Sequence, residues 1–310
     1  MAHLSGRKHG RALSRLATAV IAAALVGTTA GTAVADTPAP APAPQKATRS
    51  AAQAPAAARA ENGESRPDSP VFPLMASRGD GSLFLYFPDS HGGFADRRLV
   101  TDKWRGITAV TQTDMDQDGL ADSMYFRTLD GSLYFTTKDD KTTRIGGGWN
   151  IYDRILSPGN LGGAGQPDLL ARDKNGVLWL YLAYADGTLT DRYEVGGGWD
   201  QYTDIVGRGD YNGDGKTDIV ARDRNGVLWF YKGTGDYKRP FETRVKVGDG
   251  WDQYDFITSS GDVDLDGRSD LLARDKDGVL WLYKGNGGSR DPFDSRVKIG
   301  GGWDQYTNLF

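Results

Sequence analysis

Strand-like segments separated by Gly, Asn and Asp recur with small changes along residues 71–310. In the third copy the segments are 200–208, 217–223, 227–232 and 243–247, and Asn-Gly stands between the middle two. Asn-Gly favours a tight hairpin turn, so each copy predicts four antiparallel strands. Residues 227–231 are apolar without alternation, which predicts a strand that is covered on both faces.

A Gly-Trp pair marks the start of each copy at Trp149, Trp199, Trp251 and Trp303, and Lys103-Trp104 is a weaker mark before them. The spacing of 45 to 52 residues indicates a repeat architecture, in which each unit buries its apolar faces against its neighbours. Four-stranded sheets packed between sister sheets are the blades of a β-propeller. The sequence therefore predicts an all-β fold of this type.

The two ends of the repeat region determine the number of blades. Residues 303–310 repeat only the first strand of a unit, and residues 71–103 supply three strands near 74–78, 82–87 and 97–100. Joined together they form one blade, which leaves no free sheet edge. With units that start near residues 104, 149, 199 and 251, we predict a closed, monomeric propeller of five blades. The alternative is an incomplete ring that oligomerisation completes.

Residues 1–70 differ from the repeats. Four basic residues within 7–15 precede an apolar stretch at 16–26, and the small residues at 33–35 resemble a cleavage site, so 1–35 is predicted to be a secretory signal peptide. The apolar stretch is shorter than the ~20 residues of a membrane span. Residues 36–70 are dominated by Ala and Pro, which predicts a disordered linker. We expect a secreted, extracellular protein with no membrane contact after cleavage.

Charge and cysteine content narrow the possible partners and the means of stabilisation. Loss of residues 1–35 removes four positive and no acidic residues, so the formal charge changes from -4 to -8. Such an acidic chain is a poor match for nucleic acid. The sequence has no Cys, and a secreted protein without disulfides depends on its apolar core or on metal ions.

Three units have the spacing D-x-[DN]-x-D-G-x-x-D between their first and second strands. Alternate side chains in a tight loop direct oxygen ligands to one centre, which suits Ca²⁺. A solvated polar turn is the alternative, but closely packed carboxylates repel one another unless they are neutralised. We predict about three structural Ca²⁺ sites, in which the carbonyl groups of Leu120, Lys216 and Arg268 also bind the metal. The side-chain ligands are Asp114, Asp116, Asp118 and Asp122; Asp210, Asn212, Asp214 and Asp218; and Asp262, Asp264, Asp266 and Asp270.

The second unit differs at this position. Its loop, residues 160–168, retains the last aspartate, Asp168, but has lost the middle carboxylates. We predict that this loop binds no calcium.

On these loops and the hydrophobic strand after each of them, the units resemble FG-GAP/VCBS-type repeats, which occur in integrin α-subunit propellers and in exported bacterial proteins. The resemblance covers most of residues 71–310 and implies structural calcium. Integrin propellers have seven blades, whereas this chain predicts five. The Gly-Gly-Gly-Trp-Asp sequence and the five units are also similar to tachylectin-2-type lectin propellers. That weaker similarity implies sugar sites between the blades.

Tryptophan falls into two series. Trp179, Trp229 and Trp281 lie inside the apolar third strand, where packing between blades is expected. The other series stands at the start of the first strand and is compatible with either the core or a sugar-stacking surface. Its members Trp149, Trp199, Trp251 and Trp303 are the candidate ligand-binding residues.

Ala-Arg-Asp recurs just before the hairpin turn, at residues 171–173, 221–223 and 273–275. The pattern predicts a structural ion pair or a turn cap, with a polar site for ligand hydroxyl groups as the alternative.

Residues for catalysis are few. His91 is the only histidine after residue 35 and Cys is absent, which leaves no usual nucleophile–base pair, so no catalytic residue is predicted. A carboxylate glycosidase is an alternative, although Glu194 and Glu242 are the only glutamates of residues 71–310. We predict a non-catalytic, calcium-binding propeller that binds glycans or another extracellular polymer through repeated sites. A protein-interaction scaffold is the other alternative.

Overall fold

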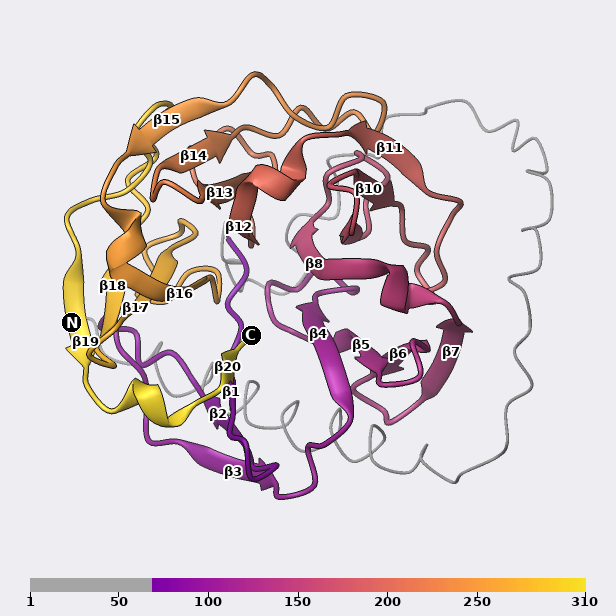
Figure 1. Cartoon of the computed structure of the whole chain (residues 1–310), viewed down its shortest axis with the longest axis horizontal. Coiled ribbons are helices and arrows are strands. Elements are labelled where there is room, and N and C mark those ends of the chain that lie inside the picture. The colour runs from indigo at the N-terminus through magenta and orange to yellow at the C-terminus, as the bar shows by residue number, and fades with distance from the viewer. Residues whose placement is uncertain (1–68) are drawn as a thin grey trace, which may run out of the picture.

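Five antiparallel sheets of four strands each stand in a ring around a central axis in the computed structural model, which describes residues 69–310 (Figure 1). The five-bladed prediction is confirmed, and the ring closes within one chain. The predicted signal peptide (1–35) and all but the last two residues of the predicted linker (36–70) lie outside the described residues. Over residues 69–310, no helix has the length and apolar character needed to cross a membrane.

Each blade pairs its four strands in a simple order, with the first strand innermost. The first blade comprises β4 (Ile107–Thr113), β5 (Ser123–Thr128), β6 (Leu133–Thr137) and β7 (Thr142–Gly146). The second comprises β8 (Tyr152–Gly159), β9 (Asp168–Asp173), β10 (Leu178–Tyr181) and β11 (Tyr193–Gly196). The third comprises β12 (Tyr202–Val206), β13 (Ile219–Asp223), β14 (Leu228–Tyr231) and β15 (Val245–Gly248). The fourth comprises β16 (Tyr254–Thr258), β17 (Leu271–Asp275), β18 (Leu280–Tyr283) and β19 (Val297–Gly300).

The closing blade takes strands from both ends of the repeat region. Its order is β20-β1-β2-β3, formed by β20 (Asn308–Leu309), β1 (Leu74–Ser77), β2 (Leu83–Tyr86) and β3 (Arg98–Thr101). In the antiparallel pair, Ala76 lies opposite Leu309, and the Phe310 N–H donates to the Met75 carbonyl oxygen at 2.9 Å. The C-terminal segment thus fills the position that a complete unit would give to its own first strand.

A single 3-10 turn begins four of the blades, at η2 (Trp149–Ile151), η3 (Trp199–Gln201), η4 (Trp251–Gln253) and η5 (Trp303–Gln305). The first strand of the third blade therefore starts at Tyr202, two residues later than the pattern predicted. Gly198, just before η3, has φ 82°, a left-handed conformation that favours glycine. The Gly-Trp mark is thus the entrance to a turn that directs the chain into the innermost strand.

The third strand differs from the prediction that both its faces are covered alike. In β14, Leu228 and Phe230 are fully buried, whereas Trp229 and Tyr231 are only half-buried. Leu228 and Phe230 pack in the cluster shared with the fourth blade, and Trp229 and Tyr231 lie against the cluster shared with the second blade. The strand is apolar throughout because both of its faces pack against a neighbouring blade, but only one of these faces is fully buried.

The chain enters the ring by crossing its axis. Residues 70–72 run between the first and fourth blades: the Val71 N–H donates to the Gly119 carbonyl oxygen at 2.8 Å, and the Asp262 N–H donates to the Pro70 carbonyl oxygen at 2.9 Å. Gly261 has φ 75°, and a Cβ atom there would clash with the Pro70 carbonyl group. Glycine therefore permits this crossing.

Candidate functional site

The four loops between first and second strands surround the axis on one face of the ring. Hydrogen bonds connect them in sequence: the Gln117 side chain donates to the Gly165 carbonyl oxygen at 2.7 Å, and the Gly209 N–H donates to the Pro158 carbonyl oxygen at 2.8 Å. The Ser269 N–H donates to the Asp210 carbonyl oxygen at 3.3 Å. The innermost strands place the loops here because each strand ends beside the axis.

The fourth loop brings together three of its predicted ligands. Carboxylate oxygens of Asp262, Asp264 and Asp270 all lie within 4.8 Å of one another, and Asp262 and Asp270 are buried. One oxygen of Asp264, Oδ1, is buried without a hydrogen-bond partner, and Oδ2 lies 2.7 Å from Lys284 Nζ. Hard oxygen atoms at this density are the ligands that Ca²⁺ prefers.

The first loop forms a similar group. Carboxylate oxygens of Asp114, Asp116 and Asp122 lie within 4.8 Å of one another. Lys138 Nζ lies 2.8 Å from Asp116 Oδ2, in the same relation as Lys284 to Asp264. Each lysine neutralises one carboxylate, so the loop retains a net negative charge that a divalent cation would offset.

The remaining predicted ligands are less closely grouped. Asp118 and Asp266 stand outside the two groups, where each accepts the N–H two residues later, at 2.8 and 2.9 Å. In the third loop Asn212 takes the middle position and donates its amide to Asp218 Oδ2 at 2.9 Å. The third loop forms no group of three acidic residues within 69–310. In this loop Asp210 is half-buried and Asp214 is exposed.

Three residues were predicted to bind the metal through their carbonyl groups. Of these, Leu120 is half-buried, and Lys216 and Arg268 are exposed.

Burial changes the protonation of these carboxyl groups. It raises the pKa of Asp262 to about 6 and that of Asp270 to about 7, with neighbouring aspartates adding to the shift. Burial and the adjacent Asp118, Asp122 and Asp116 raise the pKa of Asp114 to about 7. A cation in each loop would oppose both causes, since it stabilises the charged carboxylates.

The last aspartate of the second, third and fourth loops also connects its loop to the end of the third strand. Asp218 accepts the N–H groups of Tyr211 and Gly233, at 3.1 and 2.8 Å, and so ties the loop to the end of β14. Asp168, in the loop predicted not to bind calcium, likewise accepts the N–H groups of Leu161 and Ala183. A structural role therefore explains why Asp168 remains where the other carboxylates are lost.

The tryptophans proposed to stack on sugars are core residues. Trp149, Trp199 and Trp303 are each 7% exposed and Trp251 is 6% exposed. Each ring packs on the tyrosine of its own third strand, as Trp251 does on Tyr283 at 4.6 Å between centroids. Of the two alternatives for this series, the structure favours the core, because the preceding blade covers the indole.

The Ala-Arg-Asp motif joins neighbouring blades. Arg222 donates to the carbonyl oxygens of Trp251, at 2.8 Å, and of Tyr254, and it forms a 2.5 Å ion pair with Asp204 of its own blade. Arg127, Arg172 and Arg274 contact the following blade in the same way. The aspartate of the motif caps the hairpin, as when Asp223 accepts the Asn225 N–H at 2.9 Å. The interpretation of Ala-Arg-Asp as a structural motif is thus supported. Its arginine and its aspartate have separate partners and do not pair with each other.

The structure also contains a repeated surface site that the sequence motifs did not predict, which we term the aromatic–arginine niche. An arginine just before the fourth strand lies over the aromatic ring of the third strand and donates to the tyrosine that begins the first strand. Arg244, for example, lies 4.0 Å from the Trp229 ring centroid and hydrogen-bonds to the Tyr202 hydroxyl. The other niches comprise Arg192, Trp179 and Tyr152; Arg296, Trp281 and Tyr254; and Arg97, Phe84 and Tyr306. The recurrence of Arg about 15 residues after Trp could have indicated this contact.

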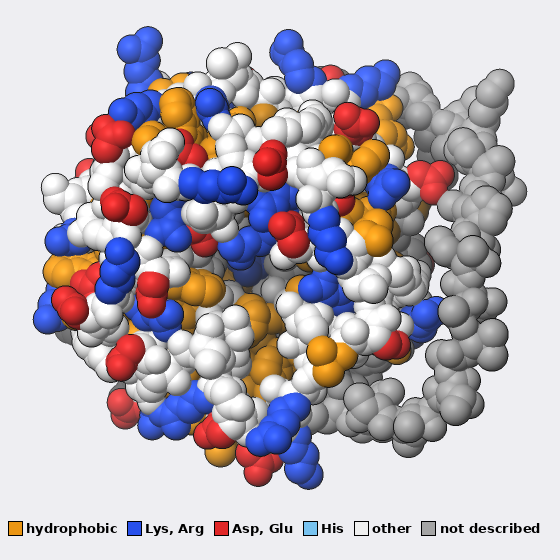
Figure 2. Space-filling view, in the orientation of Figure 1, with side chains coloured by type: hydrophobic (Ala, Val, Ile, Leu, Met, Phe, Trp, Pro, Cys, Tyr) orange, Lys and Arg blue, Asp and Glu red, His pale blue; other side chains and the backbone are white. Residues whose placement is uncertain are grey.

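The face in Figure 2 is hollowed at the ring centre, where hydrophobic and Lys or Arg side chains lie close together. Acidic and basic side chains are interspersed over the surrounding surface.

Comparison with known proteins supports the repeat assignment. Residues 161–221 and 210–273 match the family model described as FG-GAP-like repeat, so this part of the chain is similar to FG-GAP-like repeats. The resemblance recognised from the aspartate loops is confirmed. No curated protein sequence matches the chain.

Several solved structures are similar to the chain at low sequence identity. A mutant of AofleA from Arthrobotrys oligospora has 8% identity and a TM-score of 0.44, over 76% of this chain and 73% of that one. The BP39L lectin from Burkholderia pseudomallei has 15% identity and a TM-score of 0.41, over 74% and 66%. Prp20p from Saccharomyces cerevisiae has 11% identity and a TM-score of 0.38, over 73% of this chain. The chain spans 61% of the length of Prp20p and 64% of that of human WBSCR16.

Proposed function

We propose that the protein is a secreted, non-catalytic β-propeller that calcium stabilises and that binds glycans or another extracellular polymer through repeated surface sites. The calcium proposal is supported by the groups of three carboxylates within 4.8 Å in the first and fourth loops. Asp114, Asp116 and Asp122, and Asp262, Asp264 and Asp270, would hold the ions. Bound calcium would remove the repulsion between these carboxylates and join the two ends of each loop. The proposal of secretion is supported by the pattern of residues 1–35.

The polymer-binding proposal is supported by the four aromatic–arginine niches. Three of them combine a half-buried indole ring with guanidinium N–H groups and a tyrosine hydroxyl, a combination suited to the apolar faces and hydroxyl groups of sugars. In the fourth niche the ring, Phe84, is buried. Similar sites repeated on one rigid ring favour a ligand with repeated units, because avidity increases when several sites engage one polymer.

The non-catalytic proposal is supported by the positions of the residues that could act as acids or bases. Glu194, in β11, and Glu242, shortly before β15, are exposed and belong to different blades. His91 is exposed, and its ring lies 2.8 Å from the Asp89 carbonyl oxygen of its own loop. These residues do not form the paired carboxylates that a glycosidase requires.

Thermal unfolding with calcium and with a chelator tests the metal proposal. If each site has the affinity usual for extracellular modules, ~10⁻⁴ M, then ~1 mM calcium adds roughly 1.4 kcal/mol of stability per site. Asp264→Asn should remove much of this gain. Asp214→Asn in the third loop should remove less, because that loop has the weaker group of ligands. A melting temperature that does not change with chelator would contradict the proposal.

A glycan array in the presence of calcium tests the polymer proposal. We expect multivalent glycans to be retained and binding to fall when Arg244 and Arg296 are both changed to Gln. Lys174→Gln and Lys276→Gln, at exposed hairpin positions that are not part of the niches, are the matched controls. If the folded protein retains no glycan, or if the two pairs of variants bind alike, the niches are not glycan sites.

A further inference from the structure

One position beside the axis carries a different residue in each of four blades. Two residues before the start of each loop, at or just after the end of the innermost strand, stand Gln112, Pro158, Arg208 and Ser260. Only the third blade has a charged side chain at this position. The packing that all the blades share does not explain a charged residue at the centre of the ring.

Arg208 is buried without an acidic partner. The residue is 7% exposed, and no carboxylate of residues 69–310 forms a salt bridge with it. One terminal nitrogen donates to the Gln112 carbonyl oxygen at 2.6 Å, and Nε donates to the Ser259 carbonyl oxygen at 3.5 Å. The guanidinium group lies 4.6 Å from the Phe72 ring centroid. A guanidinium has five N–H donors and a permanent charge, so most of the hydrogen-bonding capacity of Arg208 remains unused and its charge has no carboxylate partner.

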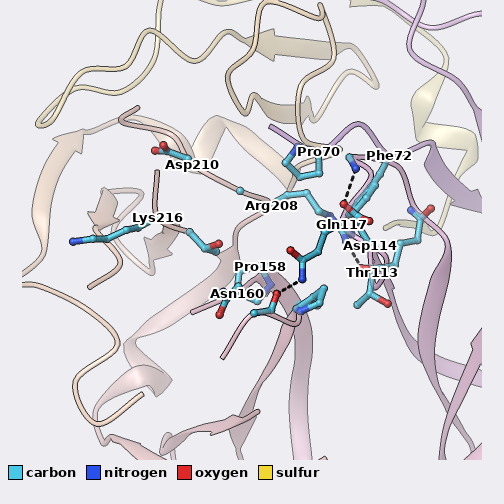
Figure 3. A pocket seen from close by; sticks show the side chains of 18 of the residues that line it. Pro70, Phe72, Thr113, Asp114, Gln117, Pro158, Asn160, Arg208, Asp210 and Lys216 are labelled. Atoms are coloured by element: carbon cyan, nitrogen blue, oxygen red, sulfur yellow. Dashed lines mark hydrogen bonds between the residues drawn. The ribbon is translucent and has the colours of Figure 1, made fainter. Parts of the chain in front are cut away.

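A second unpartnered polar group belongs to a residue that lines the same space. Arg208 and Ser157 both line a cavity of about 300 Å³ at the axis, together with Phe72, Pro158 and Thr217 (Figure 3). Ser157 is 2% exposed, and its hydroxyl oxygen is buried without a hydrogen-bond partner. The cavity thus combines a cation, a free hydroxyl group and apolar walls, and its volume is at the lower end of the range for small-molecule sites.

Two aspartates also line the cavity, but their carboxylates are engaged in their own loops. Asp114 accepts the N–H groups of Asp118 and Gly119, at 3.0 and 2.9 Å. Asp210 accepts those of Gly213 and Gly215, at 2.7 and 2.6 Å. Neither carboxylate neutralises Arg208.

We propose that this axial cavity binds the carboxylate of a small organic acid such as a sugar acid. Arg208 pairs with the carboxylate oxygens, since guanidinium and carboxylate groups match in shape and charge. The Ser157 hydroxyl donates a further hydrogen bond, and the carbon skeleton of the ligand lies against Phe72 and Pro158. The site is single and central, so it is independent of the repeated niches on the outer part of the ring.

Calorimetric titration of the full chain at a fixed calcium concentration tests the proposal, with glucuronate as the probe and glucose as its neutral counterpart. We expect glucuronate to bind and to raise the melting temperature, and glucose to do neither. Arg208→Gln should weaken glucuronate binding at least about tenfold, and Ser157→Ala should weaken it by a smaller factor, about threefold or more. Lys174→Gln, an exposed hairpin variant, should bind as the parent does.

The proposal is overturned if the folded parent binds no glucuronate, or if it binds glucose equally well. It is also overturned if folded Arg208→Gln retains the parent's affinity, which would leave Arg208 as a structural link between three blades. Should Arg208→Gln fail to fold, Ser157→Ala decides the matter, because it removes one oxygen from a cavity wall and leaves the backbone contacts in place. Parental affinity in Ser157→Ala then rejects the site.

Discussion

Trp251 donates its backbone N–H to the carbonyl oxygen of Gly226 at 2.9 Å, and so joins the first residue of the fourth blade to the hairpin turn of the third. The same bond, between 2.8 and 2.9 Å, joins Trp104, Trp149, Trp199 and Trp303 to the turn of the blade before each of them. The two most regular marks in the sequence, Gly-Trp and the hairpin glycine, are therefore the two halves of one interface. The start of each repeat is built to fit the turn of its predecessor.

Loss of an inter-blade arginine should be most harmful where its acidic partner is buried. Arg222→Met leaves the Asp204 side chain, 11% exposed, without its closest cation and leaves two carbonyl groups of the next blade without donors. Arg154 remains 3.5 Å from Asp204 but makes no bond to those carbonyl groups. We expect a loss of about 3 to 5 kcal/mol in the free energy of unfolding, measured by denaturant titration.

Arg172→Met is the matched control for this change. Its partner Asp153 has a side chain that is 43% exposed, so water can solvate the carboxylate that remains. The expected loss is about 1 to 3 kcal/mol. Equal losses in the two variants would show that burial of the aspartate has no influence.

Truncation of the two tryptophan series should separate core residues from niche residues. Trp251→Ala removes a ring that is 6% exposed and should cost about 3 to 5 kcal/mol of stability. Trp281→Ala removes a half-buried ring, its 2.7 Å bond to Asp275 and the stacked Arg296, and should cost about 1 to 3 kcal/mol. Denaturant melts of both variants check the order, and a larger loss for Trp281→Ala would reverse our assignment.

Lys284 and calcium should compete for the fourth loop. Lys284→Met removes the ammonium group 2.7 Å from Asp264, so the loop becomes more negative. We expect the metal-free protein to melt at a lower temperature and calcium to bind a few-fold more tightly, in line with the ~0.2 to 1 kcal/mol of a partly exposed ion pair. Calcium titration followed by calorimetry measures the change.

Lys276→Met, in the exposed hairpin of the same blade, controls for the general loss of a positive charge. If it tightens calcium binding as much as Lys284→Met, the effect arises from net charge and not from the contact with Asp264.

Deletion of residues 303–310 should open the ring. It removes β20 together with Trp303, Tyr306 and Leu309, all buried, and leaves the edge of β1 unpaired. Exposed strand edges pair with other chains, so we expect dimers or aggregates in light-scattering measurements after size exclusion. Thr307→Ala in the intact chain should remain monomeric. A truncated protein that is monomeric and melts at the parent's temperature would contradict this account of closure.

Local pattern was sufficient to predict much of this protein. Five blades and their closure were predicted from the 45 to 52 residue spacing, the hairpin Asn-Gly and the incomplete repeats at both ends. These signals are readable in the sequence because they involve residues close together in the chain or the number of repeats. The D-x-[DN]-x-D-G-x-x-D spacing likewise placed the acidic loops, since one tight turn brings its own side chains together. For the same reason, the loss of carboxylates at residues 160–168 was visible at once.

Only the tertiary structure decided what depends on a neighbouring blade. Trp281 stands in an apolar segment and Trp251 between Gly and Asp, yet the preceding blade covers Trp251, whereas an arginine and solvent share Trp281. Arg208 precedes an aspartate loop as an ordinary polar residue in the sequence, and its lack of a salt bridge with any carboxylate of residues 69–310 follows from its position beside the axis, just after β12. Burial and charge pairing are sums over all surrounding elements, so a repeat unit considered alone cannot determine them.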